Sequence, residues 1–211
     1  MAYDIDYVRK RLRGIDFTEY IDIVYGLKCI GARKGDTILE LGSGYGLLVR
    51  YLNSLGFITV GCDLITHYEY DVFKCDLNRE IPPLKPDYIV FQHLIEHLNQ
   101  DRVVKIMRHY LHYIGVKGIV GIVPAHYSLD KTHIVNHYTR DMLMELIEKI
   151  EPRYYYFTYD TMSYINPYSS DFLIILSNVR INLFKPYPLF VAKVFSKLLY
   201  KFLKIGGYIR C

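Results

Sequence analysis

The feature that most constrains this chain is a glycine-rich turn between an apolar run and an amphipathic segment. The turn carries Gly42, Gly44 and Gly46, and the apolar run of residues 37–41 precedes it. Leucine and tyrosine side chains then recur at helical spacing over residues 47–55. This order predicts a strand, a tight turn and a helix, whose first backbone N–H groups face a ligand. Glycine in the turn lets the main chain approach that ligand closely.

Spacing separates three kinds of nucleotide-binding loop that begin in this way. A phosphate-binding P-loop requires Gly-Lys followed by Ser or Thr, and the sequence contains no such triplet. A dinucleotide-binding fingerprint requires its third glycine at the position that Leu47 occupies. The pattern found is acidic-x-Gly-x-Gly-x-Gly, with Glu40 as its acidic residue. It resembles the first motif of the class I S-adenosylmethionine (SAM)-dependent methyltransferases.

The resemblance implies an α/β fold: a doubly wound, mostly parallel seven-stranded sheet with an antiparallel C-terminal hairpin. It divides the chain into an N-terminal helical cap (1–34), a SAM-binding domain (35–178) and a basic amphipathic tail (179–211). The two β-rich runs at 153–160 and 171–178 are expected to form the hairpin. A chain of 211 residues with a hydrophobic share of 51% is long enough and apolar enough for one such core.

Two segments around this core leave alternatives open. Asp16 and Glu19 have the spacing of a capping box, which predicts a helix that ends at Gly31. In the family, such a helix covers the cofactor or the acceptor pocket, and it can equally pack on the sheet. The segment 64–70 is shorter than the helix that the family has there. We therefore expect a turn that leaves this flank of the sheet open.

SAM carries a ribose diol and an amino-acid end, so acidic and polar side chains are expected near the turn. Asp63 follows the predicted strand 58–62, roughly twenty residues beyond the glycines, where related folds place the ribose-binding carboxylate. A carboxylate can accept hydrogen bonds from both ribose hydroxyls, and the alternative is an Asp that only forms a turn. By resemblance, Asp76 and Leu77 contact the adenine ring. The predicted cofactor-binding residues are Glu40, Gly42, Ser43, Gly44, Tyr45, Asp63, Leu64, Asp76, Leu77, Gln92 and His93.

A histidine-rich segment follows the fourth predicted strand. His93, Glu96 and His97 match the His-x-x-Glu-His signature of a class of zinc proteases. That signature requires a long helix, whereas this segment directly follows the buried strand 87–91. The methyltransferases commonly carry Leu-Glu-His-Leu here, which Ile95-Glu96-His97-Leu98 resembles. We therefore expect no zinc at these three residues, Gln92 and His93 beside SAM, and His97 near the methyl acceptor.

Three further histidines, His126, His133 and His137, lie after the predicted strand 119–123. Loops at the carboxyl ends of strands in an open α/β sheet hold ligands. Each histidine could be a general base, a metal ligand or a surface residue. His133 and His137 are four residues apart, but no Cys or Asp at fixed spacing completes a metal site. We expect no metal, and we expect His97 or His126 to act as the base if the acceptor is a hydroxyl.

The tail carries Lys193, Lys197 and Lys201 on an apolar segment, which predicts a strongly amphipathic helix. The lysines interrupt it too often for a membrane span. Residues 186–205 could instead bind a membrane surface, contact a second copy of the chain or dock on their own domain. Four cysteines without a Cys-x-x-Cys pair, and no signal peptide, indicate the cytoplasm, with peripheral membrane attachment left open.

The sequence thus predicts a SAM-dependent methyltransferase with an unidentified acceptor. A lipid-linked, glycan or small-molecule acceptor is favoured, because family members that methylate lipid-linked or glycan acceptors sometimes carry such tails. A nucleic-acid or protein methyltransferase and a non-catalytic SAM-fold binding module are the alternatives. The net charge of +4 is too mild to imply nucleic acid by itself, and no Asn/Asp-Pro-Pro-Tyr/Phe motif is present.

Overall fold

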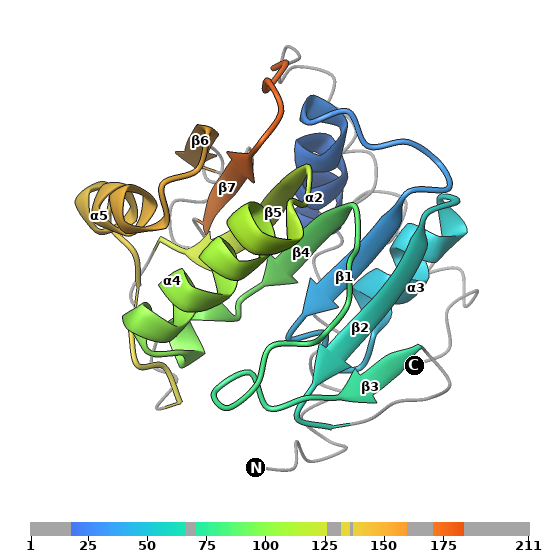
Figure 1. Cartoon of the computed structure of the whole chain (residues 1–211), viewed down its shortest axis with the longest axis horizontal. Coiled ribbons are helices and arrows are strands. Elements are labelled where there is room, and N and C mark those ends of the chain that lie inside the picture. Colours follow the sequence, from blue (N-terminus) through green and yellow to red (C-terminus); the bar gives the residue numbers. More distant parts are fainter. Residues whose placement is uncertain (1–17, 66–70, 126–131, 136, 160–170, 184–211) are drawn as a thin grey trace, which may run out of the picture.

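The computed structural model describes residues 18–65, 71–125, 132–135, 137–159 and 171–183. Seven strands form one sheet in the order β3-β2-β1-β4-β5-β7-β6 (Figure 1). They are β1 (Thr37–Leu41), β2 (Ile58–Asp63), β3 (Val72–Lys74), β4 (Tyr88–Gln92), β5 (Gly118–Pro124), β6 (Tyr154–Tyr159) and β7 (Asp171–Ser177). Strands β1 to β5 pair in parallel, whereas β7 is antiparallel to both β5 and β6. The predicted fold class is therefore confirmed, including its C-terminal hairpin.

Helices cover both faces of this sheet. They are α2 (Thr18–Cys29), α3 (Leu47–Ser54), α4 (Gln100–Arg108) and α5 (Arg140–Ile150), with a 3₁₀ turn η2 (Ile95–His97) and a π-helical segment η3 (His109–Ile114). In β4, Ile89 and Phe91 pack toward α4 and α5, and Tyr88 and Val90 pack toward α2 and α3. Figure 1 shows α4 and α3 on opposite sides of the parallel strands. Burial on both faces explains why the central strands are almost continuously apolar.

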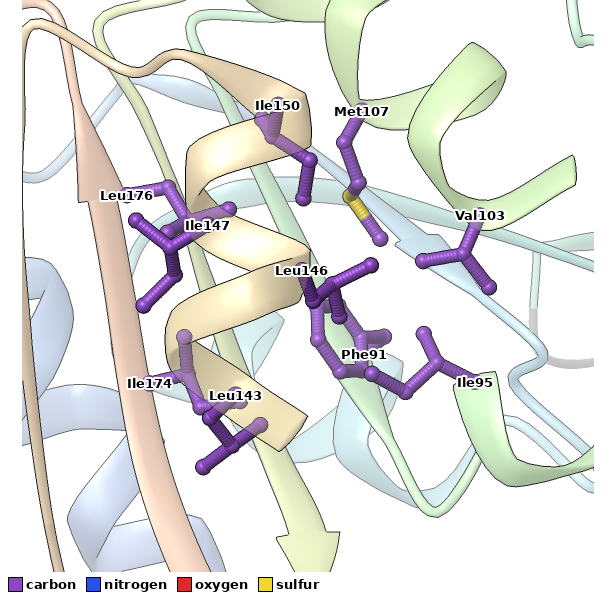
Figure 2. Close-up of a pocket in the computed structure, with 10 residues that line it drawn as sticks. All are labelled: Phe91, Ile95, Val103, Met107, Leu143, Leu146, Ile147, Ile150, Ile174 and Leu176. Atoms are coloured by element: carbon purple, nitrogen blue, oxygen red, sulfur yellow. The ribbon is translucent and has the colours of Figure 1, made fainter. Parts of the chain in front are cut away.

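The core between the sheet and the α4–α5 layer is closely packed. Figure 2 shows Phe91 of β4, Met107 of α4 and Leu146 of α5 pointing toward one another. The gap that they line has a volume of about 10 Å³. All residues that line this gap are apolar, so it offers no partner for a polar ligand or a water molecule. It is therefore a packing gap in the core and not a ligand site.

Side-chain caps fix where the two helices of this layer begin. The Asn99 side chain accepts a hydrogen bond from the N–H of Asp101 at 2.9 Å, at the start of α4. The Thr139 hydroxyl accepts one from the N–H of Met142 at 3.3 Å, at the start of α5. Such caps satisfy N–H groups that the helix itself leaves without partners.

Helix α2 packs Ile23 and Leu27 into the core on the α3 side of the sheet. Of the two alternatives for this helix, the structure thus shows packing on the sheet. The chain also returns to α2 after β7, where the N–H of Asn182 donates to the carbonyl of Cys29 at 2.8 Å.

Several sequence-based expectations concern residues outside the described ranges. These are the part of the cap before residue 18, the turn at 66–70, His126 and the amphipathic segment of the tail. The domain boundaries stay predictions. Within the described ranges, no helix is both long and apolar enough to cross a membrane.

Candidate functional site

The glycine-rich turn follows β1, as the sequence predicts, and is anchored to β2. The N–H groups of Gly42 and Ser43 both donate to the carbonyl of Cys62, at 2.9 and 3.0 Å. Gly42, Gly44 and Gly46 have φ angles of 69°, 52° and 71°. Glycine adopts this region of backbone space without the steric cost that other residues pay. The three glycines are therefore required by the path of the turn itself.

Asp63 ends β2 beside this turn. Its Oδ2 atom accepts a hydrogen bond from the N–H of Gly44 at 2.9 Å. The parallel pairing of β1 with β2 brings the two residues together. A Cβ added at Gly44 would meet no atom of the described chain within 4 Å, so this side of the turn is open. The predicted ribose-binding carboxylate and the glycine turn thus form one unit that faces open space.

Gly61 in β2 makes room for the turn, a role that sequence reasoning missed. A Cβ at this position would lie 2.5 Å from Oγ of Ser43 and 2.9 Å from Cγ2 of Val49. The available signal was a glycine inside a predicted strand, which often marks close approach of another backbone. Ser43 is buried under the turn, whereas Tyr45 is half-buried.

Glu40, the acidic residue of the glycine motif, is buried at the end of β1 with 3% of its surface exposed. Burial raises the pKa of this carboxyl well above its usual range, and the charge of Asp63 adds to that effect. A hydrogen bond from the N–H of Val49 acts in the opposite direction. Glu40 therefore supports the first turn of α3 from within the core. A direct contact with a cofactor stays a prediction.

Three further residues predicted to bind the cofactor, Leu64, Asp76 and Leu77, have different surroundings. Leu64, directly after Asp63, exposes 53% of its surface. The Asp76 carboxylate lies 3.3 Å from Nε of Arg79. Leu77 is buried, and its carbonyl accepts a hydrogen bond from the Arg102 guanidinium. Leu64 and Asp76 are therefore accessible to a ligand, while the Leu77 side chain belongs to the core.

Gln92 ends β4 and His93 follows it, and both residues contact Glu19 of α2. The Gln92 amide donates to the Glu19 carboxylate, and Nε2 of His93 lies 3.3 Å from Oε2 of Glu19. On its other side, Nδ1 of His93 lies 3.3 Å from Oε1 of Glu96. The φ angle of His93 is 48°, which few non-glycine residues adopt. The sequence placed Gln92 and His93 beside SAM and did not predict their link to α2.

Carboxylates surround the His93 ring. Burial alone would lower the pKa of the imidazole and is the largest single effect. Glu19, Glu96 and the charge of Asp171 together outweigh it and raise the pKa well above its usual value. Asp171 was missed, although a signal existed: the last strand was expected to be antiparallel. Its first residue therefore lies where the parallel strands end, opposite Pro124 of β5.

The 3₁₀ turn η2 brings Glu96 and His97 against the segment 132–135. The N–H groups of Ile134 and Val135 donate to the carbonyl of Glu96 at 2.7 and 3.1 Å. The rings of His97 and His133 meet edge to face, with centroids 4.6 Å apart. Among the histidines expected after β5, the structure therefore brings His133 to His97.

The long helix of a zinc-protease motif is not formed here. The turn η2 comprises three residues, and the His93 ring packs between Glu19 and Glu96. His137 is half-buried and directly precedes Tyr138, whose N–H donates to the carbonyl of Pro124 at 2.8 Å.

Comparison with known proteins places this geometry in a known fold. No family model matches the chain, and no curated protein matches it in sequence. A SAM-dependent methyltransferase from Archaeoglobus fulgidus aligns with a TM-score of 0.61 at 17% identity, over 83% of this chain and all of that one. The chain has the class I methyltransferase fold.

Two further methyltransferase structures show the same fold. One is the 1,6-didemethyltoxoflavin-N1-methyltransferase of Burkholderia thailandensis, with bound 1,6-didemethyltoxoflavin and S-adenosylhomocysteine. Its TM-score is 0.56 at 14% identity, over 84% of this chain and 86% of that one. The other is the magnesium protoporphyrin IX methyltransferase of Synechocystis PCC 6803 with bound S-adenosylhomocysteine. Its TM-score is 0.58 at 12% identity, over 84% and 90%.

In this methyltransferase fold, two groups of candidate functional residues lie at the carboxyl edge of the sheet. The first is the glycine turn with Asp63. The second, which we call the acid–histidine cluster, comprises Glu19, His93, Glu96, His97, His133 and Asp171. Leu94 connects the two, because a Cβ at Gly42 would lie 2.7 Å from its Cδ1 atom. A ligand on the turn would therefore have the cluster as its neighbour.

Proposed function

We propose that this chain binds SAM at the glycine turn and transfers the methyl group of SAM to a nucleophile. One observation carries the proposal: the Asp63 carboxylate is bonded to the N–H of Gly44 on the open side of the turn. A ribose diol would supply two hydroxyl donors to such a carboxylate. The common fold with two enzymes that hold S-adenosylhomocysteine supports this assignment.

In the proposed reaction the protein mainly holds two reactants in line. Bound SAM supplies an activated methyl group, and correct positioning of the acceptor can contribute roughly 7–11 kcal/mol to the rate. The carboxyl ends of β1, β2 and β4 lead into the turn, Asp63 and His93. The other residues of the acid–histidine cluster come from α2, η2, the segment 132–135 and β7. A hydroxyl acceptor would also need to lose a proton, for which the sequence predicts His97 or His126 as the base.

The class of acceptor is a separate proposal. We favour a lipid-linked, glycan or small-molecule acceptor, supported by the basic amphipathic sequence of residues 186–205. A nucleic-acid or protein acceptor and a binding module without catalysis remain the alternatives. Transfer of label from methyl-labelled SAM to separated lipid, glycan, small-molecule, RNA and protein fractions distinguishes them. Binding of SAM without transfer to any fraction would favour the module.

SAM binding itself is tested by calorimetry on the full chain and on Asp63→Ala. Loss of a charge-assisted hydrogen bond costs about 1.5–3 kcal/mol, or roughly 10- to 150-fold in Kd. Asp141→Ala is the matched control, because Asp141 is exposed on α5 and far from the turn in sequence. Circular dichroism shows whether each variant is folded. Unchanged affinity in folded Asp63→Ala would exclude the ribose assignment.

A further inference from the structure

We infer that Glu96, His97 and His133 bind one divalent transition-metal ion beside the proposed acceptor position. One potential ligand atom from each residue lies within 4.8 Å of the other two. A zinc ion with bonds of about 2.0–2.1 Å holds tetrahedral ligands roughly 3.3 Å apart, so shifts on the order of 1 Å would close the site. The three side chains come from the turn η2 and from the segment 132–135.

The carboxylate of Glu96 is the main observation that points to a cation. Its side chain is 0% exposed, and Oε1 lies 3.3 Å from Nδ1 of His93. Within the described residues, Oε2 has no hydrogen-bond partner. A buried carboxylate is costly unless its oxygens are hydrogen-bonded, paired or coordinated to a metal. A cation between Glu96, His97 and His133 would satisfy this oxygen.

The surroundings of His97 suit a metal ligand. Its Nδ1 atom lies 3.3 Å from the carbonyl oxygen of Thr132 and 3.2 Å from the Thr132 hydroxyl. A histidine that binds a metal usually donates its second ring N–H to such a carbonyl, which fixes the tautomer. With the proton on Nδ1, Nε2 carries the lone pair that a metal needs.

Backbone hydrogen bonds hold His133 beside Glu96 and His97. Two hydrogen bonds from Ile134 and Val135 to the carbonyl of Glu96 hold the segment 132–135 against η2. His133 is therefore positioned by a segment that is itself tied to another proposed ligand. The imidazoles of His97 and His133 are therefore positioned near the Glu96 carboxylate without a bound ion.

A second layer of side chains holds Glu96 in place. His93 contacts Glu96 through Nδ1 and Glu19 through Nε2, both at 3.3 Å. The backbone N–H of His93 donates to the carbonyl of Ile122 at 3.0 Å. Carboxylates that bind metals are commonly oriented by such outer contacts. We therefore assign Glu19 and His93 as positioning residues and not as ligands.

The donor set favours a borderline transition metal over Mg²⁺ or Ca²⁺. Two imidazoles and one carboxylate suit Zn²⁺, Fe²⁺ or Mn²⁺, whereas Mg²⁺ and Ca²⁺ prefer oxygen ligands alone. Three protein ligands leave a coordination position open for an oxygen atom of water or acceptor. The metal would lower the pKa of that bound oxygen. This last role rests on the proposed function, and it makes His97 a ligand in place of a base.

The inference replaces the expectation from sequence that the chain binds no metal. That expectation considered two local patterns, the motif at residues 93–97 and the pair His133 and His137. The proposed site uses neither pattern as a whole, because its ligands are 37 residues apart at the extremes, from Glu96 to His133.

The test is calorimetric titration of the untagged, chelator-treated full chain with Zn²⁺, Mn²⁺ and Mg²⁺, in the absence of SAM. We expect one Zn²⁺ or Mn²⁺ per chain and much weaker binding of Mg²⁺. Glu96→Gln and His97→Gln should each weaken Zn²⁺ binding at least a hundredfold. Glu19→Gln should weaken it about tenfold, as outer contacts do. His109→Gln, a histidine outside the acid–histidine cluster, is the matched control and should bind as the unchanged chain does.

A wild-type measurement covers the case in which a variant does not fold. Bound Mn²⁺ should broaden the imidazole NMR signals of His97 and His133 and leave those of His109 and His112 sharp. Failure of the wild-type chain to bind Zn²⁺ or Mn²⁺ stoichiometrically would overturn the inference. It would also be overturned if folded Glu96→Gln and His97→Gln bound Zn²⁺ as tightly as the wild-type chain does. A chain that binds SAM but does not bind the metal would overturn this inference alone. A chain that binds the metal but does not bind SAM when SAM is added would overturn only the proposed function.

Discussion

Replacement of Gly61 by Ala probes how closely β2 approaches the glycine turn. The added Cβ would lie 2.5 Å from Oγ and 2.6 Å from Cβ of Ser43, and 2.9 Å from Cγ2 of Val49. Ser43 and Val49 expose only 8% and 0% of their surface, so neither side chain can move aside into solvent. The chain must therefore shift, and the part nearest to the new methyl group is the turn.

The expected cost follows from two opposing effects. Three contacts below 3.0 Å against short side chains place the overpacking cost in the upper part of its usual range, about 2–3 kcal/mol. Alanine is favoured over glycine inside a strand by roughly 0.5–1 kcal/mol. The net loss of unfolding free energy is then about 1–2.5 kcal/mol, which lowers Tm by roughly 2–10 °C for a domain of this size.

SAM affinity should fall together with stability. The N–H groups of Gly42 and Ser43 donate to Cys62, the residue after Gly61, so a displaced turn also carries Gly44 away from the carboxylate on β2. Thermal unfolding followed by circular dichroism measures the first effect, and calorimetry with SAM measures the second.

Gly118→Ala in β5 is the matched control for this experiment. Its added Cβ would meet the terminal Cδ1 atom of Ile30 at 2.7 Å, which a rotation of that side chain can relieve, and the backbone oxygen of Leu176 at 3.0 Å. We expect a smaller change in Tm and no change in SAM affinity. Unchanged Tm in Gly61→Ala would refute the close packing of β2 on the turn. Lower Tm with unchanged SAM affinity would refute the coupling of β2 to the ligand site.

Three further predictions concern acid stability, the core and the tail. The pKa of Asp87 is lowered to about 2, chiefly by the hydrogen bond from the N–H of Thr37. The ionised carboxylate therefore stabilises the fold above about pH 4, and this contribution is lost as the pH falls through 2. Urea unfolding of Asp87→Asn should lack this pH dependence. Tyr110→Phe should lower the unfolding free energy in urea by about 1–2 kcal/mol, because the fully buried hydroxyl donates to the carbonyl of Pro82 at 2.8 Å. For residues 186–205, removal of the chain beyond residue 183 should abolish either co-sedimentation with anionic vesicles or self-association. If the truncated chain loses neither property, we infer that residues 186–205 dock on the chain's own domain.

The glycine turn was predictable because its information is local. The φ angles of Gly42, Gly44 and Gly46 require glycine, and the apolar runs on either side show their strand and helix periods within a few residues. Asp63 was predictable for a related reason. A strand of fixed rise that pairs in parallel with β1 must end beside the turn that follows β1.

The contacts of the acid–histidine cluster were not predictable in the same way. The sequence predicts Glu19 as part of a capping box, yet its carboxylate accepts a hydrogen bond from Gln92, 73 residues away in sequence. The sequence offered His126, His133 and His137 as candidates in one loop and favoured His126 as a base, whereas the folded segment 132–135 brings His133 to His97.

The sequence by itself thus determined the order of strands and helices, the turn and the acidic residue at the end of β2. The elements and the turn follow from backbone conformations and apolar spacing within about ten residues, and Asp63 follows from its place at the end of the strand after the turn. The tertiary structure alone decided which side chains meet at β4, because those contacts depend on how α2, η2 and β7 pack around one edge of the sheet. Asp171 shows the physical reason: it reaches His93 only because β7 runs antiparallel to β5 and begins where the parallel strands end.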